Sequence, residues 1–158
     1  MSDPKPQFSN DDEIRTLVKA FEACSFHPSE FKHYQHLTVA LWYQSHLPYD
    51  DAAERTKTGI RRLAATYGKT GYHETISVFW LRLVSGFLAG AEPAETIAIL
   101  ANQLIDKYID KNLILEYYSA ELLASTKAKS EWVEPDLKPL DFEATAGLSG
   151  RAPTGPVK

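Results

Sequence analysis

Apolar residues recur at helical spacing through almost the whole stretch from Asn10 to Ser125, rather than alternating as they do in β-strands. Residues that interrupt or end helices divide this stretch into segments of ordinary helix length: Pro28, Pro48, Gly68, Gly90 and Pro93. The pattern predicts an all-α fold, a five-helix bundle-like single domain with an extended C-terminal segment packed on it.

The expected helices follow from these boundaries. The five main ones span about residues 9–24, 30–46, 52–68, 72–89 and 93–108, and shorter helical segments are expected at 111–118 and 119–126. Gly59 lies inside the third helix, where a glycine lowers stability.

The two ends of the chain differ from this central part. Residues 1–8 are expected to form a flexible N-terminus, and residues 9–142 the helical domain. Within the domain, Pro135 and Pro139 keep the last segment extended, and its apolar residues predict that it packs along the helices. Residues 143–158 are small and rich in glycine and proline, which predicts a disordered tail.

Composition excludes several classes of function. A net charge of −4 argues against a nucleic-acid-binding protein, which usually carries a basic surface. The sequence contains no run of about 20 apolar residues, which is the length that a membrane-spanning helix needs. Cys24 is the single cysteine, which fits a reducing compartment, and the N-terminus lacks a signal-peptide pattern. We therefore expect a cytoplasmic protein.

Three histidines stand where two of the expected helices begin. His33 and His36 fall in the first turns of 30–46, and His73 falls in the first turn of 72–89. When residues are placed about 100° apart around each helix axis, all three lie near the centre of an apolar face. They are therefore expected to face the core rather than water.

The lengths of the connections suggest that these histidines meet. Short links between the second, third and fourth helices favour antiparallel neighbours, so the second and fourth helices would run parallel. Their N-termini would then share one end of the bundle. Helix N-termini and burial both favour a neutral imidazole, which is the form that coordinates metals or exchanges protons. We expect His33, His36 and His73 to line one buried site.

Two functions fit such a site. The first is a mononuclear metal centre, zinc or iron(II), in an enzyme of unknown substrate, with His33, His36 and His73 as ligands and a fourth position that is open or filled by Glu74 or water. The alternative is a metal-free ligand-binding or protein-interaction module in which the histidines are structural. The HxxH spacing is not the HExxH motif of zinc peptidases. Whether the protein is an enzyme is left open.

Other residues are candidates for the same site. Glu74 could act as a general base beside a metal-bound water, although a solvated acid in a first helical turn explains it too. Tyr72 and Tyr118 could bind a cofactor or ligand through their hydroxyls, or fill the core. Asp136 could close the pocket, or form a turn between prolines. The expected partner is a small molecule, and a homodimer is compatible with the sequence.

Four blocks of sequence occur in a fixed order: FKHYQHLTVALWY, YHETISVFW, EYYSAELLAS and WVEPDLKPL. Their combination resembles a group of small bacterial all-helical proteins whose activity is not established. The resemblance covers about residues 21–140, and the matching positions are Phe31, His33, His36, Leu37, Tyr72, His73, Thr75, Tyr118, Ser119, Pro135 and Asp136. It implies an all-helical fold in which the histidines belong together, and it implies no substrate.

Overall fold

The structure is a computed structural model, and it describes residues 7–68, 72–92 and 96–142. These residues form α-helices and two 3-10 helices, with no β-strand among them. The prediction of an all-α fold is therefore confirmed. The tail expected at 143–158 and residues 1–6 of the expected flexible N-terminus lie outside the described residues.

Five long helices carry the fold: α1 (Asp11–Glu22), α2 (His33–His46), α3 (Tyr49–Thr66), α4 (Glu74–Ala89) and α5 (Ile97–Tyr108). A 3-10 helix, η1 (Pro28–Glu30), precedes α2. A second 3-10 helix, η2 (Lys111–Glu116), follows α5 and leads into two short helices, α6 (Ala120–Leu123) and α7 (Thr126–Ser130). Segment 111–118, expected to be α-helical, therefore takes the tighter 3-10 form over most of its length.

Polar side chains explain where several helices begin. Each accepts a hydrogen bond from the backbone N–H three residues further on, as an N-cap does: Asn10 before α1, Thr96 before α5, Ser119 before α6 and Ser125 before α7. His73 does the same for α4. This cap explains why α4 begins at Glu74, two residues later than the sequence predicted.

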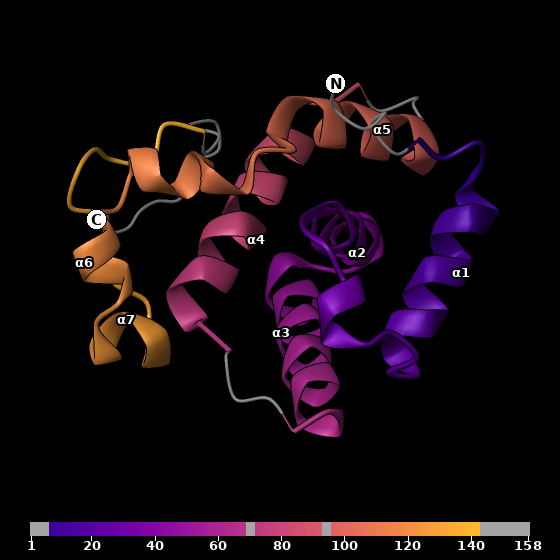
Figure 1. The fold of residues 1–158 in the computed structure, drawn as a ribbon. Helices are drawn as coiled ribbons and strands as arrows, with labels where there is room; N and C mark the ends of the chain where they lie inside the picture. Colours follow the sequence, from indigo (N-terminus) through magenta and orange to yellow (C-terminus); the bar gives the residue numbers. More distant parts are fainter. Residues whose placement is uncertain (1–6, 69–71, 93–95, 143–158) are drawn as a thin grey trace, which may run out of the picture.

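Helix α2 lies at the centre of the molecule. Figure 1 shows it almost along its axis, and it contacts α1, α3, α4 and α5. Its buried residues point in several directions around the axis: Gln35, Leu37, Thr38, Val39, Ala40, Leu41 and Tyr43. A helix that is apolar on nearly all sides is stable only when other elements surround it. The other long helices therefore wrap around α2.

The relative directions of the helices differ from the expected bundle. In Figure 1, α3 and α4 run across the view while α2 points along it, so both cross α2 steeply. The prediction that α2 and α4 run parallel was therefore wrong, although residues at the N-terminal ends of both helices line one pocket. A short link fixes only the distance between two helix ends, whereas the side chains at the contact set the crossing angle.

Gly59 has a packing role inside α3. A Cβ atom at this position would lie 2.3 Å from ring atoms of Phe21 on α1. The missing side chain therefore gives the Phe21 ring its place against the backbone of α3, and the ring is almost completely buried. The close approach of α1 and α3 offsets the low helix propensity of glycine.

The segment that follows α7 packs on the helices, as predicted. Its apolar side chains Trp132, Val133, Leu140 and Phe142 contact the core. The Tyr118 hydroxyl donates to the Val133 carbonyl at 2.6 Å, and the Leu137 N–H donates to the Tyr117 carbonyl at 2.9 Å. Hydrogen bonds and apolar burial thus both attach this extended segment.

Phe8 is attached at the other end of the domain. Its backbone N–H donates to Asn102 Oδ1 at 2.8 Å, and Asn102 Nδ2 donates to its carbonyl at 3.0 Å. The Phe8 side chain also packs against the core. The ordered domain therefore includes one residue that was expected to belong to a flexible N-terminus.

Candidate functional site

A pocket of about 820 Å³ lies among α2, α3, α4 and η2, and its walls are mostly apolar. His33, His36 and His73 all line it, together with Trp80 and Ile76 of α4. Two other hollows, of about 750 and 610 Å³, contain no histidine in their walls. Binding sites for small molecules are usually apolar pockets of this size with a few polar groups.

His33 begins α2 and reaches across to two other elements. Its Nε2–H donates to the carbonyl of Tyr108 at 3.0 Å, which leaves Nδ1 as the acceptor nitrogen. Its ring meets Trp80 edge-on, with 4.4 Å between ring centroids. Burial and the nearby charge of Lys111 lower the pKa of His33 despite the bond to Tyr108. The imidazole is therefore neutral near pH 7.

His36 lies one turn further along α2. Its ring stands edge-on to Phe31, with 4.4 Å between centroids. Burial, helped by the neighbouring His33, lowers the pKa of His36 from 6.5 to about 4. The His36 ring also makes a hydrogen bond to the Phe31 backbone. In a neutral imidazole the single N–H makes that bond, which leaves the other ring nitrogen as an acceptor without bringing a charge into the pocket.

His73 has a structural role, because both of its ring nitrogens make hydrogen bonds to backbone groups. Nδ1 accepts a hydrogen bond from the Ile76 N–H at 3.2 Å and so caps α4. Nε2–H donates to the Leu123 carbonyl of α6 at 2.7 Å. Neither nitrogen keeps a lone pair for a metal ion. As a ligand, His73 would have to break the cap of its own helix.

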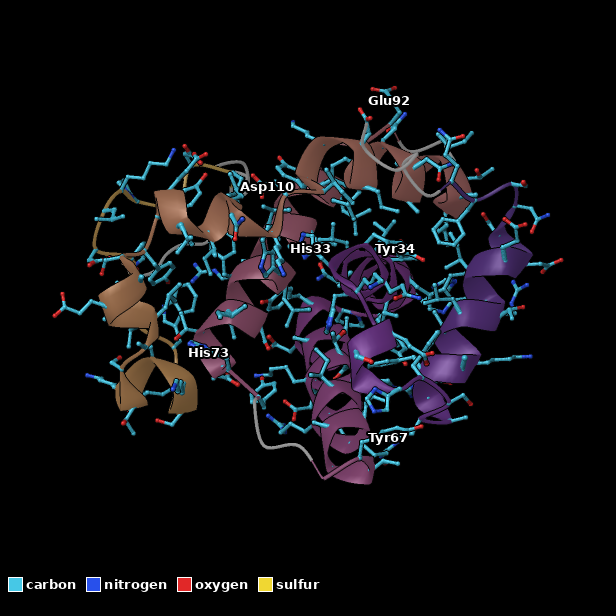
Figure 2. All side chains as sticks on the ribbon, viewed as in Figure 1. His33, Tyr34, Tyr67, His73, Glu92 and Asp110 are labelled. Atoms are coloured by element: carbon cyan, nitrogen blue, oxygen red, sulfur yellow. The ribbon has the colours of Figure 1, made fainter. Side chains whose placement is uncertain are left out.

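The crossing of the helices also separates the histidines. His33 packs on Trp80, which lies seven residues, or about 10 Å, along α4 from His73. Figure 2 shows His73 at the N-terminal end of α4, whereas His33 of α2 lies beside a later part of α4. Among the described residues, no three His, Cys, Asp or Glu side chains are placed to hold a metal ion. The three predicted ligands thus share a pocket without converging on one point.

Glu74, the candidate base, is held by two partners and does not line the pocket. Its carboxylate accepts hydrogen bonds from Lys57 Nζ at 3.0 Å and from the Tyr72 hydroxyl at 2.7 Å. Burial alone would raise the pKa of Glu74, but these two hydrogen bonds outweigh it and lower the pKa. A carboxylate stabilised in this way is a weak base.

The two candidate tyrosines occupy different places. Tyr72 lines the pocket, and burial together with its hydrogen bond to Glu74 raises the pKa of its hydroxyl. Tyr118 is completely buried, does not line the pocket and donates its hydroxyl to the C-terminal segment. Tyr118 therefore belongs to the core, which was the other reading of its position.

Asp136 does not close the pocket either. Its carboxylate accepts hydrogen bonds from the backbone N–H and the hydroxyl of Ser119, at 2.8 and 2.7 Å. These bonds lower the pKa of Asp136. Ser119 is the N-cap of α6, so Asp136 fixes the extended segment to the start of that helix. This contact spans 17 residues, so it is neither the closure of the pocket nor the local turn between prolines that the sequence suggested.

The pocket also has lining residues that the sequence analysis did not select as site candidates. Phe31 and Trp80 supply aromatic walls, and Lys32 and Lys111 add two positive charges. Trp80 could have been found, because it shares the apolar face of α4 with His73. Lys111 reaches the pocket only through the packing of η2, and no local sequence pattern indicates such a contact.

Comparison of the chain with known protein families, characterised proteins and solved structures found no match. Among the described helices, none is both long enough and apolar enough to cross a membrane. The inference of function therefore rests on the geometry of the pocket.

Proposed function

We propose that this protein binds a small, largely apolar molecule in the histidine-lined pocket, without a metal ion. One observation carries the proposal: the neutral imidazoles of His33 and His36, with His73 opposite them on another helix, border a single apolar hollow of about 820 Å³. Proteins close-pack their cores, so a purely structural cluster of histidines would be expected in solid packing rather than around a hollow.

The walls suit an apolar body that carries some polar atoms. Trp80, Phe31 and Ile76 offer apolar and aromatic contact area. His36 offers, within the same wall, the ring nitrogen that is not bonded to the Phe31 backbone. A ligand atom that donates a hydrogen bond can therefore be recognised without an ionic partner inside the pocket.

A metal centre is the weaker candidate for three reasons given by the side chains. His73 uses both ring nitrogens for backbone groups, and His33 meets α4 about two turns away from His73. Glu74, which would have to activate a metal-bound water, is already paired with Lys57. We therefore propose binding and assign no reaction.

Isothermal titration calorimetry with 2-naphthaleneethanol, an uncharged aromatic alcohol, tests this function. Ser77 lines the pocket on α4, and Ser77→Phe should fill it and abolish binding. Leu115→Trp, at an exposed position of the pocket wall, is a second blocking variant that leaves the core untouched. Ser45→Phe is the matched control, because Ser45 is exposed on α2 and lies outside the pocket.

The proposal expects saturable binding with one site per chain in the wild type and in Ser45→Phe. It expects a loss of at least about tenfold in affinity in the blocked variants, because the ring would lose its contact area. Equal affinity in all four proteins, or the absence of binding to the wild type, would overturn it.

A further inference from the structure

The charged residues that line the pocket are all of one sign. Lys32 and Lys111 are among the lining residues, whereas no aspartate or glutamate is. The whole chain carries a net charge of −4, so this local excess of positive charge runs against the average of the molecule. With His33 and His36 neutral, the lining has a charge of about +2 near pH 7.

Neither lysine has an acidic partner among the described residues, since no ion pair found there involves Lys32 or Lys111. Asp110 directly precedes Lys111, and its carboxylate accepts the Asn112 N–H at 2.9 Å and so caps η2. At His33, the effect of Lys111 on the pKa exceeds the opposite effect of Asp110. At His33, therefore, the charge of Lys111 outweighs that of Asp110.

The two lysines occupy exposed positions of the pocket lining. Lys32, Lys111 and Leu115 are exposed, and together they define the mouth of the pocket. Trp80 and Ile76 are half-buried apolar lining residues, and Leu37 is a buried one. Helix α2 starts immediately after Lys32, and the positive end of its dipole adds to the field of the two lysines.

We infer that the ligand is an apolar acid: a molecule with an aromatic or aliphatic body and one carboxylate. The body occupies the apolar interior, and the carboxylate stays at the mouth between water and the two lysines. A carboxylate in the interior would lose its hydration without gaining an ionic partner, so the acid group has one favourable position. This inference rests on the proposed function and narrows it to a class of ligand.

Three probes with the same ring system test it: 2-naphthaleneacetate, 2-naphthaleneethanol and 2-(2-naphthyl)ethylamine. Calorimetric titration at low salt should give the tightest binding for the acid, about three- to tenfold tighter than the alcohol, and the weakest for the amine. Higher salt should reduce the preference for the acid, because the lysines are exposed.

Variants at the mouth assign that preference to the lysines. Lys32→Gln/Lys111→Gln should lower the affinity for the acid to that of the alcohol and leave the alcohol unchanged. Lys127→Gln/Lys129→Gln is the matched control, since both lysines are exposed on α7 and neither lines the pocket, and it should keep the preference.

The outcomes separate the two proposals. Binding of the alcohol as tightly as the acid, or a preference for the acid that survives in Lys32→Gln/Lys111→Gln, would overturn the inference and leave the binding function standing. Failure of all three probes to bind the wild type would overturn the binding function and the inference that depends on it.

Discussion

The imidazole of His36 is kept neutral by its surroundings, and this has a consequence for stability. In the unfolded chain this histidine titrates near 6.5, whereas burial lowers its pKa to about 4 in the fold. Between these values the unfolded state binds more protons than the folded state. His36 therefore contributes stability that is fully present above pH 6.5 and is lost as the pH falls towards 4.

We predict that the free energy of unfolding of the wild type decreases between pH 6.5 and 4, and that His36→Leu reduces this decrease by up to about 3 kcal/mol. Urea denaturation at several pH values measures the effect. His33 remains in the variant and retains its own contribution of the same sign. His46→Leu serves as the control, because His46 is exposed at the end of α2. An identical pH dependence in the wild type and His36→Leu would contradict this account.

Single residues show how far the sequence could predict the site. The inward direction of His33, His36 and His73 followed from helical periodicity, and all three line one pocket. Their hydrogen bonds could not be predicted in the same way. His73 caps α4 and bonds to Leu123, fifty residues later, and no local pattern indicates a contact of that range.

At the scale of elements, one buried side chain of α4 makes hydrogen bonds to two backbone groups at the start of the C-terminal segment. Thr75 is completely buried, and its hydroxyl donates to the Glu131 carbonyl at 2.8 Å. The same oxygen accepts the Val133 N–H at 3.2 Å. A single hydroxyl thus pairs two backbone groups of a segment that has no regular secondary structure of its own.

We predict that Thr75→Val, which keeps the shape and removes the hydroxyl, lowers the free energy of unfolding by about 1–3 kcal/mol, because two backbone groups lose their partner. Thr75→Ser keeps the hydroxyl and loses only a methyl group, for about 1 kcal/mol. Chemical denaturation of the two variants compares these effects. If the valine variant were as stable as the serine variant, the hydroxyl would not hold the segment.

The boundaries of the elements were partly predictable. Pro48 correctly placed the end of α2, and Gly68 follows α3 with a positive φ of 71°. The start of α4 was missed because histidine is not among the residues that usually cap helices. The 3-10 form of η2 was missed as well, since its apolar residues fit an α-helix equally well and tertiary packing decides between the two forms.

For the whole molecule, the central position of α2 decides which residues meet. The run of apolar residues from Val39 to Tyr43 indicates a helix that is buried on nearly all sides, and this signal was present in the sequence. The steep crossing of α3 and α4 over α2 was not, because it depends on how side chains of distant segments fit together. Because of that crossing, His33, His36 and His73 line one pocket instead of converging on a single metal ion.

The central claim is that this pocket binds an apolar molecule without a metal ion. The most direct measurement is an ¹H–¹⁵N titration of protein purified without a histidine tag, using 2-naphthaleneethanol with and without EDTA. The account predicts that shifts concentrate at His36, Ile76 and the Trp80 indole N–H, and that EDTA leaves the affinity unchanged. Binding that is lost with EDTA, restored by one zinc ion per chain and absent in His36→Ala would contradict it.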